Sequence, residues 1–253
     1  MHLLEWLLLA YLLVFFPVWE LIHGRSDRER LQADPALKVP LYRTICLQLW
    51  MPTLLLLALY VSGSLSVSEL PILVPIDLAQ AIALLALLAV IGYLGFSLSR
   101  VVQDAEVRQQ TAEALRDQAW SLPVNRREAG WFIGPVSLSA GICEELLFRG
   151  YLIPWLGQAL PIWAAVLLSS VLFGLLHAYQ GPAGIVRTGA VGLVLALVFV
   201  ATGSLLVPIV LHVVVDAYAG ALSWISLRDD DAKRPPDHAG QRSTKGAPAA
   251  RSA

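Results

Sequence analysis

Two adjacent glutamates and an arginine lie inside an otherwise apolar stretch, GICEELLFRGYL, at residues 141–152. An ionisable side chain at the centre of a membrane costs about 2.5–3.5 kcal/mol on insertion scales, so these groups must face protein or a wet cavity. Glu145 and Arg149 are four residues apart, which places a carboxylate and a cation on one helical face. Glu144 is turned about 100° away from that face. The spacing predicts a structural ion pair between Glu145 and Arg149 and leaves the Glu144 carboxylate available for chemistry.

Two further apolar stretches each carry a histidine. Phe173 and His177 lie in SSVLFGLLHAYQ, and His212 and Asp216 lie in LHVVVDAYAG; each pair is four residues apart and shares a helical face. Either histidine alone is as consistent with a hydrogen bond between helices as with catalysis. Together with the glutamates they predict one dry site that holds a base, two imidazoles and a further carboxyl group. Small neighbours would let the helices approach closely, namely Ser169, Ser170, Gly174, Ala217, Ala219 and Gly220.

The composition places this site in a membrane protein. Of the 253 residues, 57% are hydrophobic and 15% charged, and the mean hydropathy is +0.66, far from the balance of a soluble domain. The net charge of −1 indicates no acidic or basic partner, because the charges are segregated along the chain. Cys46 and Cys143 fall in apolar runs and resemble core residues rather than a disulfide framework.

Long apolar stretches predict an all-α, polytopic bundle of about seven transmembrane spans. A helix needs about 20 residues to cross a bilayer, and such stretches occur at residues 3–22, 41–61, 79–98, 131–156, 161–179, 184–203 and 205–226. The first is expected to remain as an anchor, since no basic segment precedes it and no A-x-A-like site follows it. Arginine and lysine fall in alternate loops, so the positive-inside rule predicts the N-terminus outside and the C-terminus cytoplasmic.

The same pattern divides the chain into four regions. Residues 1–98 form an N-terminal three-helix transmembrane region, and residues 131–227 form a four-helix core that carries the site. Between them, residues 99–130 are a cytoplasmic or interfacial linker, whose helix over 101–120 suits either a membrane surface or an ordinary solvated connection. The tail, residues 228–253, is polar and proline-rich, which predicts disorder.

The three motifs together resemble the CPBP family, the intramembrane proteases that include type II CAAX prenyl endopeptidases and Abi-like bacterial proteins. The pattern is E-E-x-x-x-R, then F-x-x-x-H, then H-x-x-x-[N/D] on successive apolar helices, over roughly residues 130–226. The resemblance implies hydrolysis of a peptide bond near or within the membrane. Glu144 would be the general base on a water that His177 orients, and His212 and Asp216 would stabilise the oxyanion. Supporting roles would then fall to Glu145, Arg149 and Phe173.

Asp216 departs from the usual family residue, which is asparagine. An ionised aspartate cannot donate a hydrogen bond to an oxyanion. Two roles therefore stay open for this side chain. Either Asp216 carries a proton in its apolar setting, or its charge holds the tautomer of His212.

This chemistry requires no cofactor, although a zinc ion could be held by Glu144, His177 and His212. The chain lacks H-E-x-x-H, which would place two ligands and a base on one helix. The expected partners are a membrane-associated protein or peptide substrate and the lipid bilayer, with no nucleic acid. Arginine outnumbers lysine and alanine is abundant, which suggests a multi-pass protein of a bacterial inner membrane.

Two other classes of function fit a buried Glu, His and Asp set. An ion- or proton-coupled transporter uses such residues as a path through the bundle. A non-catalytic membrane partner, such as an immunity protein, would keep the fold without the chemistry. A cleaved product would indicate the protease. Transport that depends on pH or membrane potential would indicate the transporter, and retention of function by Glu144→Gln would indicate the partner.

Overall fold

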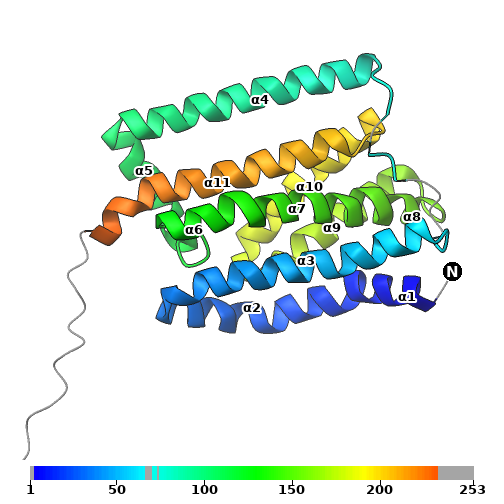
Figure 1. Cartoon of the computed structure of the whole chain (residues 1–253), viewed down its shortest axis with the longest axis horizontal. Helices are drawn as coiled ribbons and strands as arrows, with labels where there is room; N and C mark the ends of the chain where they lie inside the picture. The colour runs from blue at the N-terminus through cyan, green and yellow to red at the C-terminus, as the bar shows by residue number, and fades with distance from the viewer. Residues whose placement is uncertain (1–2, 66–69, 73, 233–253) are drawn as a thin grey trace, which may run out of the picture.

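The computed structural model describes residues 3–65, 70–72 and 74–232. Within these residues every regular element is helical and none is a strand, which confirms the predicted all-α class. The helices lie side by side in an elongated bundle (Figure 1). In chain order they are α1 (Leu3–Ala10), η1 (Tyr11–Phe15), α2 (Phe16–Ala33), η2 (Pro35–Leu37), α3 (Lys38–Val61), α4 (Leu78–Gln103), α5 (Ala105–Leu115), η3 (Arg116–Gln118), α6 (Arg126–Trp131), η4 (Phe132–Val136), α7 (Ser137–Glu144), η5 (Glu145–Leu152), α8 (Ile153–Gly157), α9 (Ile162–Leu175), η6 (Ala178–Gln180), α10 (Pro182–Thr202) and α11 (Leu206–Ala232).

Among the residues that the structure describes, six helical stretches are long and apolar enough to cross a membrane. They correspond to six of the seven predicted spans and identify the chain as a multi-pass membrane protein. The fourth stretch is continuous from α6 to α8 and contains two π-helical segments, η4 and η5. The six stretches are Leu3–Gly24, Pro35–Val61, Leu78–Gln103, Arg126–Gly157, Pro182–Thr202 and Leu206–Arg228.

The remaining predicted span, residues 161–179, is shorter than expected. α9 covers 14 residues, Ile162–Leu175, or about 21 Å at 1.5 Å per residue, whereas a hydrocarbon core is about 30 Å thick. The chain leaves the helix through a 3-10 turn that ends at Gly181, whose φ of 81° favours glycine. Hydropathy alone included this turn in the span, because the apolar run continues through Leu176 and no Asp, Glu, Lys or Arg interrupts it before residue 179.

Although α9 is short, the last helix ends at the end of the bundle opposite to the one where the first helix begins. α1 begins at one end of the bundle and α11 finishes at the other (Figure 1). α9 and α10 pack together as neighbouring helices within that path. This arrangement is the one that an odd number of passes produces. Which end faces the cytoplasm stays a prediction.

Side-chain caps determine where the helices around the linker begin. Asp77 and Gln80 form a capping box at the start of α4, with backbone-to-side-chain distances of 2.9 and 2.7 Å. Asp104 has an extended backbone that ends α4, and its carboxylate accepts hydrogen bonds from the first amides of α5. The linker helix predicted over 101–120 therefore begins later, at Ala105, because Val101 and its neighbours still belong to α4.

Buried polar contacts tie the end of the linker to α3. Lys38 Nζ donates to the backbone oxygens of Ala119 and Leu122 at 2.7 and 3.0 Å. The hydroxyl of Tyr42 donates to the backbone oxygen of Ser121 at 2.7 Å. The segment that leads into α6 is thus fixed against the N-terminal helices, and with it the start of the helical stretch that carries Glu144.

α7 and α11 pack closely because a glycine lies between them. A Cβ atom at Gly141 would lie too close to the Val213 side chain and 2.9 Å from its backbone nitrogen. Glycine therefore lets the two helix backbones approach each other more closely than any other residue would. Glu144 follows Gly141 by one turn and His212 precedes Val213, so this contact brings two of the predicted site residues to the same depth.

α11 continues further than the predicted tail boundary. It runs to Ala232, so residues 228–232, predicted to begin the disordered tail, are helical. Hydropathy marks where a helix leaves the membrane, whereas the backbone can continue its hydrogen bonds into polar sequence. The rest of the tail, residues 233–253, lies outside the described residues.

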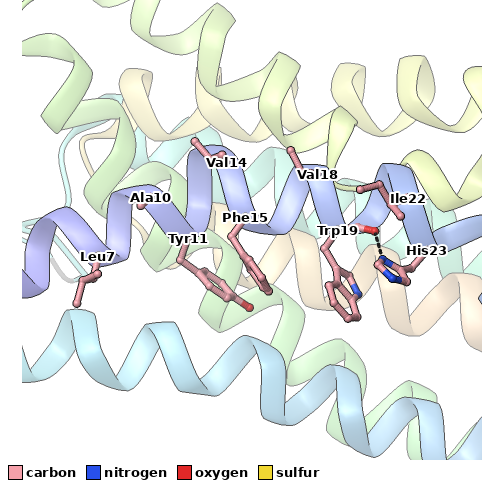
Figure 2. Close-up of a pocket in the computed structure, with 9 residues that line it drawn as sticks. All are labelled: Leu7, Ala10, Tyr11, Val14, Phe15, Val18, Trp19, Ile22 and His23. Carbon is pink, nitrogen blue, oxygen red and sulfur yellow. Dashed lines mark hydrogen bonds between the residues drawn. The ribbon is translucent and has the colours of Figure 1, made fainter.

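An open groove of about 570 Å³ follows the outer side of the first span (Figure 2). Along it, Tyr11, Phe15, Trp19 and His23 stack in sequence with ring-centroid separations of 5.6, 5.8 and 4.0 Å. Phe15 and Trp19 are exposed. The groove contains none of the predicted site residues, and its aromatic, apolar surface suits contact with lipid.

Candidate active site

The predicted pair between Glu145 and Arg149 is confirmed. Arg149 Nη1 donates to Glu145 Oε1 at 2.9 Å, and both side chains are completely buried. Both residues lie in η5, a π-helical segment that begins directly after Glu144. π-helical turns are rare and recur at functional sites. The charges therefore compensate each other within one irregular turn of the helix.

Arg149 also joins this helix to α10. Its Nη2 donates to the backbone oxygen of Gly192 at 2.7 Å. The guanidinium carbon lies 4.6 Å from the centre of the Phe173 ring, which provides a cation–π contact from α9. Arg149 thus contacts three elements at once, and Phe173 packs against its guanidinium.

Gly192→Ala is expected to destabilise the protein by about 1–3 kcal/mol, the usual effect of overpacking. A Cβ atom at Gly192 would lie 2.8 Å from Phe173 Cδ1 and 3.3 Å from Arg149 Nη2. Unfolding in detergent should show the loss. Gly95→Ala in α4 is the matched control, because nothing lies within 4 Å of the added Cβ. Equal stability of the two variants would contradict the close packing at Gly192.

His212 lies at the centre of the carboxylates. Its Nδ1 is 2.8 Å from Glu145 Oε1, so this nitrogen donates to an oxygen that can only accept when ionised. Its Nε2 is 3.6 Å from Asp216 Oδ2 and 3.9 Å from Glu144 Oε2. The ring is therefore oriented by Glu145, while Nε2 faces the two other carboxylates.

Glu144 differs from the adjacent Glu145 in that it makes no hydrogen bond within the described residues and lies beside open space. Its Oε2 is buried and has no hydrogen-bond partner among the described residues. The side chain as a whole is 15% exposed, in contrast with the completely buried Glu145. It lines a cavity of about 80 Å³, large enough to hold water. This position is the one expected of a side chain that acts on a water molecule.

His177 reaches the same cavity from the turn after α9. Its Nδ1 lies 2.8 Å from the backbone oxygen of Phe173, an acceptor, so Nδ1 carries the proton and Nε2 of the neutral ring is left as an acceptor. The Phe173 ring lies 5.1 Å from the His177 ring and 6.0 Å from the His212 ring. His177 thus shares the cavity with Glu144, whereas His212 and Asp216 are not among the residues that line it.

Four of the described residues that line this cavity are polar and are not included in the motifs: Tyr11, Glu20, Gln48 and Tyr179. Glu20 and Gln48 come from α2 and α3, in the first two apolar spans. A polar side chain inside an apolar span is the signal that could have pointed to them. Tyr179 belongs to the turn that hydropathy assigned to a span.

The optional zinc ligands Glu144, His177 and His212 do not converge on one position. No group of three His, Cys, Asp or Glu side chains that could hold an ion occurs in the described part of the chain. The Nδ1 atoms of the two histidines are directed at Phe173 and Glu145 instead.

The fold and the site define a multi-pass membrane protein whose interior holds adjacent glutamates, two histidines and an aspartate. Residues 126–218 match the family model of the type II CAAX prenyl endopeptidases, Rce1-like. No curated protein and no solved structure matched the chain. The matched segment contains all three motifs, so the match supports the resemblance to the CPBP family of intramembrane proteases that the motifs predicted. This similarity supports a protease that acts in a lipid bilayer on peptide substrates.

Proposed function

We propose that the chain is a glutamic-type intramembrane endopeptidase, in which a water activated by Glu144 and His177 hydrolyses a peptide bond near or within the membrane. The contrast between the two adjacent glutamates carries the proposal. Glu145 binds Arg149 and His212 through Oε1 and does not line the cavity, whereas Glu144 lines the cavity and its Oε2 has no hydrogen-bond partner among the described residues. A carboxylate placed in this way can accept a proton from water.

The steps follow from the positions of the side chains. Glu144 accepts one proton as the water oxygen attacks the carbonyl carbon of the substrate, and His177 Nε2 accepts a hydrogen bond that orients the same water. The carbonyl oxygen gains negative charge, which a cationic His212 and a protonated Asp216 stabilise by donating to it. In this form His212 keeps Nδ1–H on Glu145 and donates Nε2–H to the oxygen. Glu144 then passes its proton to the leaving nitrogen as the C–N bond breaks, and the two peptide products depart.

No cofactor is needed for these steps, because side chains supply both the base and the donors. The proposed setting is a bacterial inner membrane with the end of α11 on the cytoplasmic side, as the distribution of basic residues predicts. The site would then be reached by membrane proteins or membrane-anchored peptides rather than by soluble ones.

Comparison of membrane proteomes tests this function directly. Cells that express the wild type should contain new peptide C-termini that are missing from cells that express Glu144→Gln at the same level. A wild-type effect that survives in Glu144→Gln would indicate a non-catalytic partner instead. Uptake or currents that depend on pH, without any new terminus, would indicate the transporter.

Asp216→Asn is expected to keep or raise the rate of cleavage and to extend activity to higher pH. Asp216 lies at Nε2 of His212, whereas the opposite nitrogen, Nδ1, is bound by Glu145. The structure thus favours the donor role over the orienting role, and an amide donates at every pH. A pH–rate profile of both proteins on one reporter peptide checks this.

A fall in rate at every pH would instead assign Asp216 the orienting role, as when the carboxylate that holds a catalytic histidine is replaced by an amide. If the pH–rate profiles of wild type and Asp216→Asn coincide, Asp216 has neither role, and its remaining function is a hydrogen bond between helices.

A further inference from the structure

The cavity beside Glu144 and His177 is completed by helices outside the segment that matches the family. Glu20 of α2 and Gln48 of α3 form part of its wall. None of the 14 described residues that line it is lysine or arginine. Within the described part of the chain, the cavity therefore presents two carboxylates, those of Glu20 and Glu144, and no side-chain cation to a substrate.

Close packing at Gly24 holds the helix of Glu20 against the turn that follows His177. A Cβ atom at Gly24, one turn after Glu20, would lie 2.9 Å from Tyr179 Cβ and 3.5 Å from Glu20 Oε2. The ring of Tyr179 in turn lies 5.8 Å from the ring of His177. Glu20, Tyr179 and His177 thus form a continuous part of the wall, and α2 cannot move away from the cavity without losing the contact at Gly24.

Glu20 has no structural partner that would explain its presence in an apolar span. No hydrogen bond or ion pair within the described residues involves its carboxylate. It lies one helical turn before the end of the stretch Leu3–Gly24. This depth is near the membrane boundary, where the long side chains of Lys and Arg in membrane peptides place their charged groups.

We propose that Glu20 is a substrate-binding residue that recognises a lysine or arginine side chain beside the scissile bond. The inference rests on the proposed endopeptidase activity, since it assigns a ligand to the same cavity. A cation would be attracted by both carboxylates, whereas an acidic side chain or a free C-terminal carboxylate would meet like charges. The substrate class is therefore a membrane-anchored peptide with a basic flank.

A peptide library with a fixed apolar anchor and a short randomised flank tests the proposal. The full-length protein in lipid vesicles is incubated with the library, and mass spectrometry identifies the products. Wild type is expected to favour Lys and Arg over Asp and Glu about fivefold at one flank position, as a partly exposed ion pair would. Glu20→Gln should remove this preference, Glu20→Lys should reverse it, and Glu20→Asp should keep its direction.

Asp27→Asn is the matched control. Asp27 lies on the same helix, pairs with Arg30 at 3.8 Å on an exposed surface and does not line the cavity. This variant should keep the wild-type preference. A preference that changes as much in Asp27→Asn as in Glu20→Gln would mean that the net charge of the helix matters rather than Glu20, and would overturn the proposal.

Binding measured without cleavage separates this proposal from the proposed function. The same library, carrying a photo-crosslinker, is captured by protein with Glu144→Gln, alone and combined with Glu20→Gln. Basic peptides captured through Glu20, with no cleavage by wild type, would support the binding role and overturn the peptidase. Cleavage with the same residue distribution in wild type and Glu20→Gln would overturn the binding role and leave the peptidase in place.

Discussion

Glu144→Gln is expected to lower the kcat for peptide hydrolysis by about a thousandfold, within the range that a general base contributes. Glutamine keeps the size of the side chain but cannot accept the proton of the attacking water. The free energy of unfolding should stay close to that of wild type, because Glu144 Oε2 has no hydrogen bond to lose among the described residues. Cleavage of a reporter peptide and thermal unfolding of the same preparations measure the two effects.

Glu145→Gln is the matched control, since it makes the same chemical change one residue further along the chain. This variant should lose stability, because Glu145 Oε1 accepts from both Arg149 and His212. The two substitutions thus predict opposite patterns. A Glu144→Gln protein with full activity would remove the general-base role, and one as unstable as Glu145→Gln would show that Glu144 is structural as well.

The sequence predicted the helices and the Glu145–Arg149 pair because both depend on local spacing. An apolar run of about 20 residues specifies a span whatever surrounds it, and residues four apart meet on any helix. The same reasoning failed at α9, where the turn that ends the helix carries no charged aspartate, glutamate, lysine or arginine to mark it and contains His177. The length of α9 is set by Gly181 and by packing against α10, which hydropathy does not register.

Contacts between distant parts of the chain lay beyond that reasoning. The bond between His212 and Glu145 joins residues 67 apart, and the bond from Arg149 to the Gly192 backbone joins residues 43 apart. The motif spacing pointed to Asp216 as a partner of His212, but it could not tell which ring nitrogen each carboxylate faces. The structure places Glu145 at Nδ1 and Asp216 at Nε2, and this distinction separates an orienting group from a candidate oxyanion donor.

Arg149→Ala is expected to lower the free energy of unfolding by about 3–5 kcal/mol, the range found when one partner of a buried ion pair is removed. The substitution leaves the Glu145 carboxylate buried without its cation and removes the donor to the Gly192 backbone. It also removes the contact with the Phe173 ring. Activity should fall with the folded fraction. Unfolding in mixed detergent micelles and the rate per folded molecule measure the two quantities separately.

The double variant Glu145→Gln with Arg149→Met tests whether stability and activity depend on the two charges or on the hydrogen bonds that these side chains make. Removing both charges avoids an unpaired buried carboxylate, so most of the stability lost in Arg149→Ala should return. The glutamine oxygen can still accept from His212 Nδ1 and keep the ring oriented, so the folded double variant should retain measurable cleavage. A double variant that is stable but inactive would show that the charge of Glu145 acts on His212 during the reaction. If the Arg149→Ala protein were inactive yet as stable as wild type, Arg149 would have a catalytic role rather than a structural one.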